Sequence, residues 1–133
     1  MLSVRIRLNV MRILLVGAGG FLGTLLRYWL SDLIAKRYGE TFPLGTLIVN
    51  ALGCFLAGFI FYFLYERLLT SPTSRTVVFI GLLGGFTTFS SYALQTLTLL
   101  RDGEVFLAIL NIAASNILGL FLVWAGYSLA RMI

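Results

Sequence analysis

GGFTTFSSY, residues 84–92, lies in the middle of an apolar segment that is long enough to cross a membrane. Its two glycines and its run of hydroxyl residues are poor helix formers. A backbone that leaves helical geometry at membrane depth must be buried in protein or must line a polar cavity. Transporters place ion sites in broken helices of this kind. The stretch therefore predicts an interrupted membrane helix in a protein that binds or moves an ion.

The composition around this stretch predicts one all-α integral membrane domain covering residues 1–133. The chain is 59% hydrophobic and 11% charged, whereas soluble domains carry roughly 25% charged residues. Each of four apolar stretches reaches the roughly 20 residues needed to cross ~30 Å of hydrocarbon. They cover about 13–34, 43–65, 76–100 and 105–130, and the third contains the break near 84–88.

The N-terminal segment, residues 1–12, is basic and precedes the first span. It resembles the start of a signal peptide, but the apolar run continues to about Leu30 without a small-residue cleavage site. We therefore expect a retained first span in a multi-pass protein of a prokaryotic plasma (inner) membrane. Met11 is an alternative start of translation.

Several function classes lack the residues they need. There is no His, and the single cysteine, Cys54, lies in an apolar stretch. No zinc, haem or thiol-catalysis ligand set is available, and no nucleophile–base pair can be assembled, so we do not expect an enzyme. The basic residues are scattered near span ends, which is typical of topology signals and not of nucleic-acid binding.

The charges barely choose an orientation for the chain. Four spans put both termini on one side, and the basic residues of that side are Arg5, Arg7, Arg12, Arg67, Arg75 and Arg131. The other side holds Lys36, Arg37 and Arg101. With so weak a bias the chain could insert both ways. Two oppositely inserted copies could then pair about a two-fold axis in the membrane plane, as the inverted repeats of transporters do.

The glycines of the first span allow two interpretations. Gly17, Gly20 and Gly23 have the spacing of a dinucleotide-binding turn, but that motif needs a preceding strand and a βαβ unit. Close helix packing explains them better, because Gly19 and Gly23 form a face of small residues, and the pair 81 and 85 repeats the spacing.

Two polar residues within the spans also allow more than one role. Arg27, near the end of the first span, either extends to the interface, attracts anions into a vestibule or links to a partner loop. Asn50, several residues into the second span, either makes a helix–helix hydrogen bond or donates to an anion.

Polar side chains continue along the third and fourth spans at helical spacing. One face of the third span holds Thr88, Ser91, Gln95 and Thr98, and the neighbouring face holds Phe89, Tyr92 and Thr96. The fourth span carries Asn111, Ser115 and Gly119 on one face. These faces either line a narrow, water-filled ion pathway or hold helices together. No Asp or Glu lies deep in a span, which favours a small anion over a cation as the permeant species.

Three motifs together resemble the Fluc/CrcB family of fluoride channels. They are GGFLGTLLRY at 19–28, PLGTLIVNALG at 43–53 and GGFTTFSSY at 84–92. The resemblance covers all four spans in order. It implies an antiparallel, dual-topology homodimer in the lipid membrane, with two pores for passive fluoride export.

The resemblance also implies roles for individual residues. A structural Na⁺ at the dimer interface is held by backbone carbonyls, and the matching positions are Gly84 and Thr87. Asn50 matches the family's pore amide, and Ser115 falls near a hydroxyl position of the fourth span. Phe89 matches the first of two pore-lining phenylalanines. The second position is Tyr92 here, so a hydroxyl is added to the ring edge. The family often has Thr where Ser91 stands and Glu where Gln95 stands.

Two rival functions remain at this point. One is a small dual-topology exporter of organic cations, which the missing intramembrane carboxylate disfavours. The other is a non-transporting membrane assembly protein, in which the polar faces only hold helices together. Ion flux through the purified protein in liposomes distinguishes both from a channel.

Overall fold

The computed structural model describes the backbone of residues 2–133 and the side chains of residues 9–133. Within that range the chain is helical and has no strand. Four segments are long and apolar enough to cross a membrane: Asn9–Tyr38, Leu44–Arg67, Pro72–Arg101 and Val105–Arg131. The prediction of an all-α protein with four membrane-spanning helices is therefore confirmed. The side chains of Arg5 and Arg7, which the orientation argument counts, lie outside the described part.

The first, second and fourth crossings are each built from one long helix. These helices are α1 (Leu2–Tyr38), α2 (Leu44–Phe61) and α6 (Val105–Arg131), and α2 continues into a π-helical segment, η1 (Tyr62–Arg67). The third crossing is divided into four pieces. They are α3 (Pro72–Thr76), the π-helical η2 (Val77–Leu83), α4 (Gly84–Phe86) and α5 (Phe89–Arg101).

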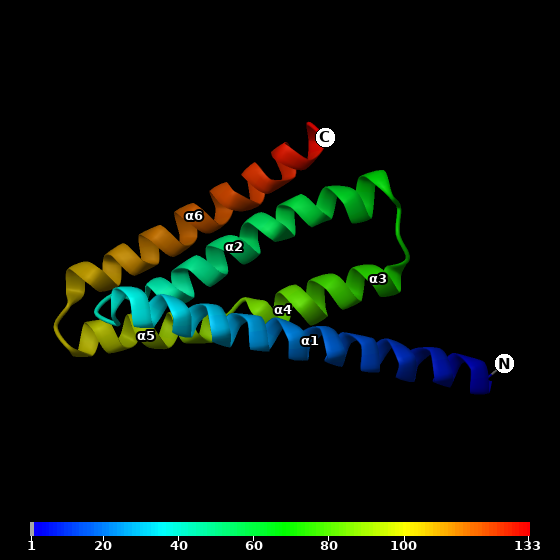
Figure 1. Cartoon of the computed structure of the whole chain (residues 1–133), viewed down its shortest axis with the longest axis horizontal. Coiled ribbons are helices and arrows are strands. Elements are labelled where there is room, and N and C mark those ends of the chain that lie inside the picture. Colours follow the sequence, from blue (N-terminus) through cyan, green and yellow to red (C-terminus); the bar gives the residue numbers. More distant parts are fainter. Residues whose placement is uncertain (1) are drawn as a thin grey trace.

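The crossings pack as two layers (Figure 1). α2 and α6 lie side by side and antiparallel, and they make the most extensive contact between any two elements. α1 packs against η2 and α4. Both chain ends lie at one end of the bundle, while the α1–α2 connection and the α5–α6 turn lie at the other (Figure 1). Chain direction thus alternates from one crossing to the next.

Close backbone approach holds α1 against η2 and α4. A Cβ added at Gly23 would overlap the carbonyl oxygen of Leu82, and one at Gly85 would lie 2.5 Å from the carbonyl oxygen of Gly20. The predicted small-residue packing of the first and third spans is confirmed. The dinucleotide-binding alternative fails, because the segment from Gly17 onward lies inside one uninterrupted helix and follows no strand.

A second glycine contact joins α2 to α6. The sequence placed Gly58 in an approximate small-residue face with Asn50 and Cys54, but its partner on the fourth span was missed. A Cβ at Gly58 would overlap the Val123 carbonyl oxygen, and one at Gly126 would overlap the Phe55 carbonyl oxygen. These two glycines are 68 residues apart in the chain, so no local spacing pattern connects them. They let two backbones meet along the most extensive contact of the bundle.

Replacing Gly126 by alanine is expected to lower the free energy of unfolding by about 1–3 kcal/mol, as overpacking of a well-packed interior does. The new methyl group would meet backbone atoms of Phe55, which cannot rotate away. Gly17→Ala is the matched control, because nothing lies within 4 Å of a Cβ at that position. Unfolding of both variants in detergent measures the difference, and equal stability would contradict the packing argument.

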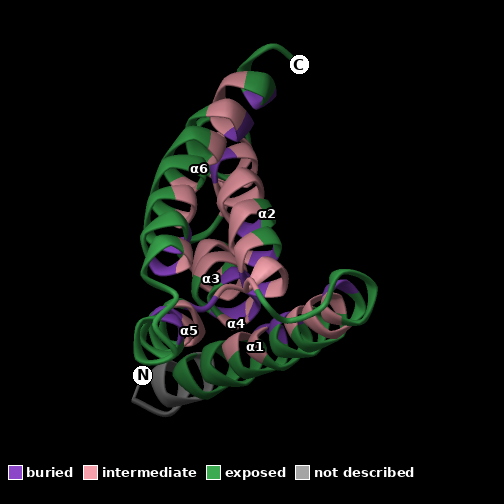
Figure 2. Ribbon diagram, turned by 90° about the vertical axis from the view of Figure 1, so that its left-hand side faces the viewer, coloured by how far each residue is buried: buried purple, intermediate pink, exposed green. Residues whose placement is uncertain are grey.

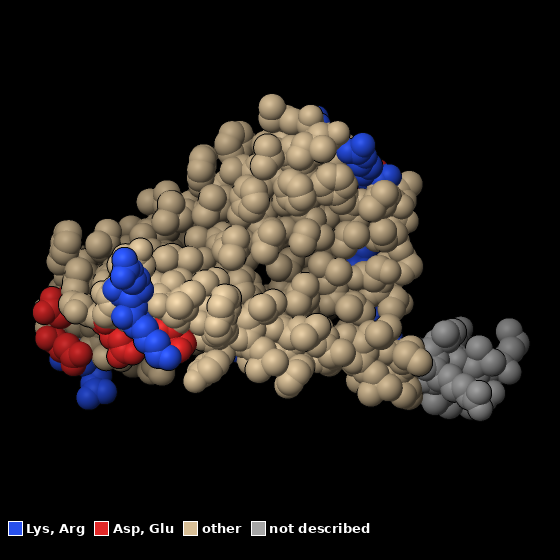
Figure 3. All heavy atoms as spheres, viewed as in Figure 1, with Lys and Arg blue, Asp and Glu red and all other residues tan. Residues whose placement is uncertain are grey.

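The outer surface is apolar, with charges near the two ends. Large apolar side chains such as Phe21, Leu120 and Trp124 are exposed, and the outward faces of α1 and α6 are exposed over much of their length (Figure 2). Most of the central surface in Figure 3 carries no charged side chain, and the acidic side chains visible there gather at one end. This distribution fits helices surrounded by hydrocarbon and bounded by two polar interfaces.

Candidate ion site between α4 and α5

The backbone leaves helical geometry between α4 and α5. Thr87 has φ −87° and ψ 159°, and Thr88 has φ −149° and ψ 116°, so both residues are extended. Thr87 still donates its N–H to the Leu83 carbonyl oxygen at 2.9 Å, which closes the last turn before the extended pair. The peptide groups of this pair need partners from elsewhere, because a lone polar group at membrane depth is costly.

Asn50 of α2 supplies those partners for Thr88. Its Nδ2 donates to the Thr88 carbonyl oxygen at 2.9 Å, and its Oδ1 accepts from the Thr88 N–H at 2.8 Å. The amide thus pairs with the extended residue as a neighbouring strand would, although the two residues are 38 positions apart. Thr88 is buried, so both bonds are shielded from competition by water. One Nδ2 hydrogen remains for another acceptor.

Two backbone carbonyls lose their usual helical partners at this point. In a continuous helix the Thr88 N–H would bond to the Gly84 carbonyl, and the Ser91 N–H would bond to the Thr87 carbonyl. Here the first of these N–H groups bonds to Asn50, and the second bonds to the Thr88 hydroxyl at 3.2 Å, which caps α5. The carbonyl oxygens of Gly84 and Thr87 therefore lack the N–H partner that a continuous helix would give each of them.

A cavity of about 400 Å³ lies beside the extended segment. It is lined by the predicted pathway residues Asn50, Thr88, Phe89, Tyr92 and Ser115, by Gly84 and Thr87, and by further residues including Asn116. The residues that line it come from the second, third and fourth crossings and include no Asp or Glu. The groups facing this space are thus uncharged: amides, hydroxyls, aromatic rings and backbone, together with a thiol and aliphatic side chains.

Ser91 and Arg27 are placed apart from this lining. The Ser91 hydroxyl accepts a hydrogen bond from the Thr88 hydroxyl at 3.0 Å, so it belongs to the cap of α5 and not to the cavity wall. The Arg27 side chain is half-buried on α1 and lines neither cavity described here. Its three alternatives stay open.

Some of the polar side chains predicted on the faces of the third and fourth spans join α5 to α6. Asn111 is 2% exposed, and its Nδ2 donates to the Thr96 hydroxyl at 2.9 Å, which in turn donates to the Tyr92 carbonyl oxygen at 2.8 Å. The Ser115 hydroxyl reaches Asn111 Oδ1 at 3.5 Å while also lining the cavity. The helix-linking interpretation therefore applies to Asn111 and Thr96, one turn away from the cavity.

Two aromatic rings and an amide lie together in the lining of the cavity. The rings of Phe89 and Tyr92 lie with centroids 5.3 Å apart and planes tilted by 57°, and the Phe89 side chain is 78% exposed. Asn116 Nδ2 donates to the Tyr92 hydroxyl oxygen at 3.3 Å. Sequence reasoning missed Asn116, although an amide in the middle of the fourth span was a visible signal.

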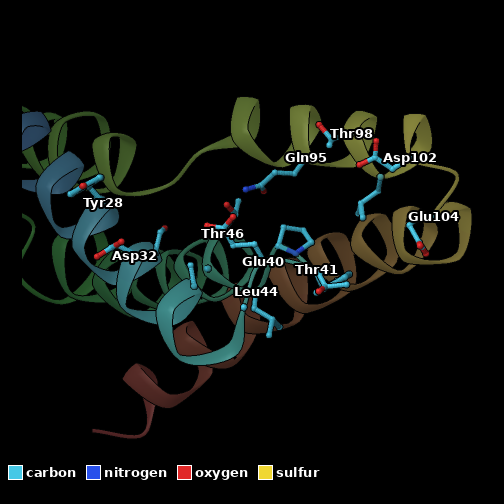
Figure 4. A pocket seen from close by; sticks show the side chains of 17 residues that line it. Tyr28, Asp32, Glu40, Thr41, Leu44, Thr46, Gln95, Thr98, Asp102 and Glu104 are labelled. Atoms are coloured by element: carbon cyan, nitrogen blue, oxygen red, sulfur yellow. The ribbon is translucent and has the colours of Figure 1, made fainter.

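A second, larger cavity lies at the end of the bundle that holds the α1–α2 connection and the α5–α6 turn. Its volume is about 700 Å³, and Asp32, Glu40, Asp102 and Glu104 are among the residues that line it (Figure 4). Gln95 from α5 and Thr46 from α2 point toward each other across it, and Gln95 Oε1 is buried without a hydrogen-bond partner. Asp32 is paired with Lys36 at 2.6 Å.

The two cavities differ in the ion that they favour. Carboxylates around the larger cavity repel an anion, and in the described part of the chain no three His, Cys, Asp or Glu side chains are grouped to hold a metal ion. The smaller cavity offers neutral donors and two aromatic rings, whose edges carry partial positive charge. The site beside the extended segment is therefore the better candidate for a small anion.

Comparison with known proteins agrees with this geometry. The family model described as CrcB-like protein, Camphor Resistance (CrcB), matches residues 14–127. Similar curated proteins are each named fluoride-specific ion channel FluC. The one from Opitutus terrae is 49% identical over 116 residues, which is 86% of this chain and 88% of the relative. The one from Chlorobium phaeobacteroides is 45% identical over 120 residues, 90% of this chain and 93% of the relative. The one from Aquifex aeolicus is 40% identical over 116 residues, which is 87% of this chain and 94% of the relative. The chain belongs to the CrcB family.

Proposed function

We propose that this chain forms a fluoride-selective channel in the plasma membrane of a prokaryote. Relatives that cover most of the chain are named fluoride-specific ion channels and come from bacteria, and four helices cross the membrane. The observation on the chain itself that carries the proposal is the cavity beside Thr88, which presents neutral donors and no carboxylate. A cavity of this kind suits the passage of a small ion, and the relatives are named as channels and not as enzymes.

The chemistry of the cavity suits fluoride. Fluoride is small and strongly hydrated, so stripping its water is costly unless protein groups replace the lost hydrogen bonds. The second Nδ2 hydrogen of Asn50, the Tyr92 hydroxyl and the ring edge of Phe89 are already in place around the cavity. Preplaced donors offset the dehydration cost for a small anion more fully than for chloride, whose larger size weakens each contact.

The direction of transport follows from the membrane potential. Hydrogen fluoride enters a cell from an acidic medium as a neutral molecule and dissociates in the neutral cytoplasm. The potential, negative inside, drives the resulting anion outward. Passive conduction is therefore enough for export, and no coupled ion is needed.

The active form is a dual-topology, antiparallel homodimer with two pores. In a single chain the side chains of Phe89, Ser90 and Asn116 are exposed in the middle of the crossings, where polar groups facing lipid are costly. A second copy or a wet pathway has to cover them. Among the described side chains the two ends differ little in basic residues: Arg12, Arg67, Arg75 and Arg131 against Lys36, Arg37 and Arg101. That near balance permits insertion in both directions.

A structural Na⁺ at the dimer interface uses the carbonyl oxygens of Gly84 and Thr87. These are the two oxygens whose helical N–H partners are taken by Asn50 and by the Thr88 hydroxyl. Carbonyl oxygens are ligands suited to a hard cation, and two protomers together supply four of them. The ion's contribution is to hold the two interrupted crossings together.

Fluoride efflux from liposomes tests the function. Liposomes containing the purified dimer are expected to release fluoride rapidly to an electrode and to retain chloride in a matched control. Replacing Na⁺ on both sides by N-methylglucamine is expected to reduce the fluoride rate. If the protein has the mass of two chains in detergent and releases neither fluoride nor chloride, channel function is contradicted. An unchanged rate without Na⁺ would contradict only the cation site.

The carboxylate-lined cavity is the one feature that favours the rival function, an exporter of organic cations. The same liposomes separate the two, because an exporter would move a fluorescent cation such as ethidium and release no fluoride. If the liposomes retain both fluoride and ethidium, the remaining candidate is the function of a non-transporting membrane assembly protein.

A further inference from the structure

The Tyr92 hydroxyl has one hydrogen-bond partner, and that partner is a donor. Asn116 Nδ2 donates to Tyr92 Oη at 3.3 Å and to the Ile112 carbonyl oxygen at 2.8 Å. These two bonds use both hydrogens of the amide nitrogen. A hydroxyl that accepts from an amide has its own hydrogen left to donate. Within residues 9–133 no protein acceptor takes the Tyr92 hydrogen.

The rest of the Tyr92 side chain is held in place. Its ring packs against Phe89 with centroids 5.3 Å apart, and its hydroxyl oxygen accepts from Asn116 Nδ2 at 3.3 Å. Tyr92 and Asn116 both line the cavity of about 400 Å³ together with Asn50. The free hydroxyl hydrogen therefore belongs to a side chain that is oriented at the ring and at the oxygen, beside the space proposed for the anion.

The position of Asn116 argues for a role beyond linking helices. Asn116 is exposed, twelve residues into the 27-residue helix α6, whereas the helix-linking amide on the same helix, Asn111, is 2% exposed. An exposed amide at that depth is costly in hydrocarbon. It is tolerated where it faces a space with polar groups, and Asn116 lines the cavity together with Asn50, Tyr92 and Ser115.

We propose that Asn116 is a positioning residue that presents the Tyr92 hydroxyl to fluoride as a hydrogen-bond donor. The proposal rests on the fluoride-channel function above and adds to it a binding element. By occupying the hydroxyl oxygen from one side, Asn116 turns the O–H bond away from α6. Fluoride gains one donor, and a larger anion with more diffuse charge gains less from it. The pair therefore raises affinity and selectivity at the aromatic side of the cavity.

A double-mutant cycle on fluoride efflux tests this arrangement. The variants are Tyr92→Phe, Asn116→Leu and the double variant, and the measured quantities are the half-saturating fluoride concentration and the maximal rate. Tyr92→Phe is expected to raise the half-saturating concentration about tenfold, the worth of one hydrogen bond to a charged group. Asn116→Leu is expected to raise it several-fold, and the double variant no more than Tyr92→Phe alone.

The control and the contrary outcomes are distinct. Ile117→Ala, at an exposed apolar position on the next residue of α6, should leave both quantities unchanged. Additive effects, or a lower maximal rate with an unchanged half-saturating concentration, would show that Asn116 acts only on structure and would overturn the proposal. Asn116→Ala provides a second variant if Asn116→Leu does not assemble. Absence of fluoride efflux from the wild-type chain would instead contradict the channel function itself.

Discussion

Substituting Asn50 by leucine is expected to abolish fluoride efflux and to lower the free energy of unfolding by about 2–5 kcal/mol. The substitution removes both hydrogen bonds to Thr88, at 2.9 and 2.8 Å, and leaves a buried N–H and a buried carbonyl without partners. Each such orphaned group costs about 1–3 kcal/mol. The extended pair then loses the two hydrogen bonds that hold it to α2, and the cavity wall changes shape with it.

The aspartate variant makes the prediction sharper. Asn50→Asp keeps an oxygen that accepts from the Thr88 N–H, but it places a carboxylate oxygen against the Thr88 carbonyl oxygen. It is therefore expected to lose efflux as fully as the leucine variant does. Ile48→Leu, a change on the same helix that removes no hydrogen bond, is the control. Thermal unfolding in detergent and liposome efflux are the measurements, and near-normal efflux from Asn50→Leu would contradict a structural clamp at this residue.

Phe89→Ile is expected to reduce fluoride efflux to the background of empty liposomes while the protein still folds and dimerises. Phe89 is 78% exposed in the chain. Its replacement by a smaller side chain therefore creates almost no void inside the chain. What is lost is the positive ring edge beside Asn50 and Tyr92, which isoleucine cannot reproduce. The predicted effect is therefore on conduction and not on stability.

Phe121→Ile is the matched control for that experiment. Phe121 is another exposed phenylalanine within a crossing, but it does not line the cavity at the extended segment. Its substitution is expected to leave efflux and unfolding unchanged. Normal flux through a folded Phe89→Ile dimer would refute the contribution of the ring edge and leave the amide and hydroxyl donors as the pathway.

Much of the candidate site could be anticipated from residue types and spacing. The glycines and threonines of residues 84–88 predicted an interruption, but Gly84–Phe86 are helical, and only Thr87 and Thr88 are extended. Asn50, Phe89 and Tyr92 were identified by their motifs, and all three line the same cavity. These signals are local, because helix propensity and side-chain chemistry depend on a residue and its near neighbours.

Other parts of the site depend on which faces meet. The sequence allowed two alternatives for the Asn50 side chain, a hydrogen bond between helices or a hydrogen bond donated to an anion. In the structure the side chain bonds to the backbone of a residue 38 positions away. Ser91 shares a helical face with Thr88 but is used in the cap of α5. Asn116 lies next to Ser115 in sequence, and its contact with Tyr92 required the rotation of α6 against α5 to be known. Spacing along one helix cannot supply that rotation.

Sequence alone thus determined the membrane environment, the four crossings and the stretch that is prone to interruption. All of these follow from composition summed over short windows, and lipid imposes a length on each window. Tertiary structure alone decided which carbonyls are left free, which amide clamps the extended pair and which hydroxyl faces the cavity. Those outcomes depend on the depth and rotation at which glycine contacts such as Gly23 on Leu82 and Gly126 on Phe55 lock the helices together. A hydrogen bond requires its donor and acceptor atoms to lie within about 3.5 Å, a distance that no periodicity in the chain specifies.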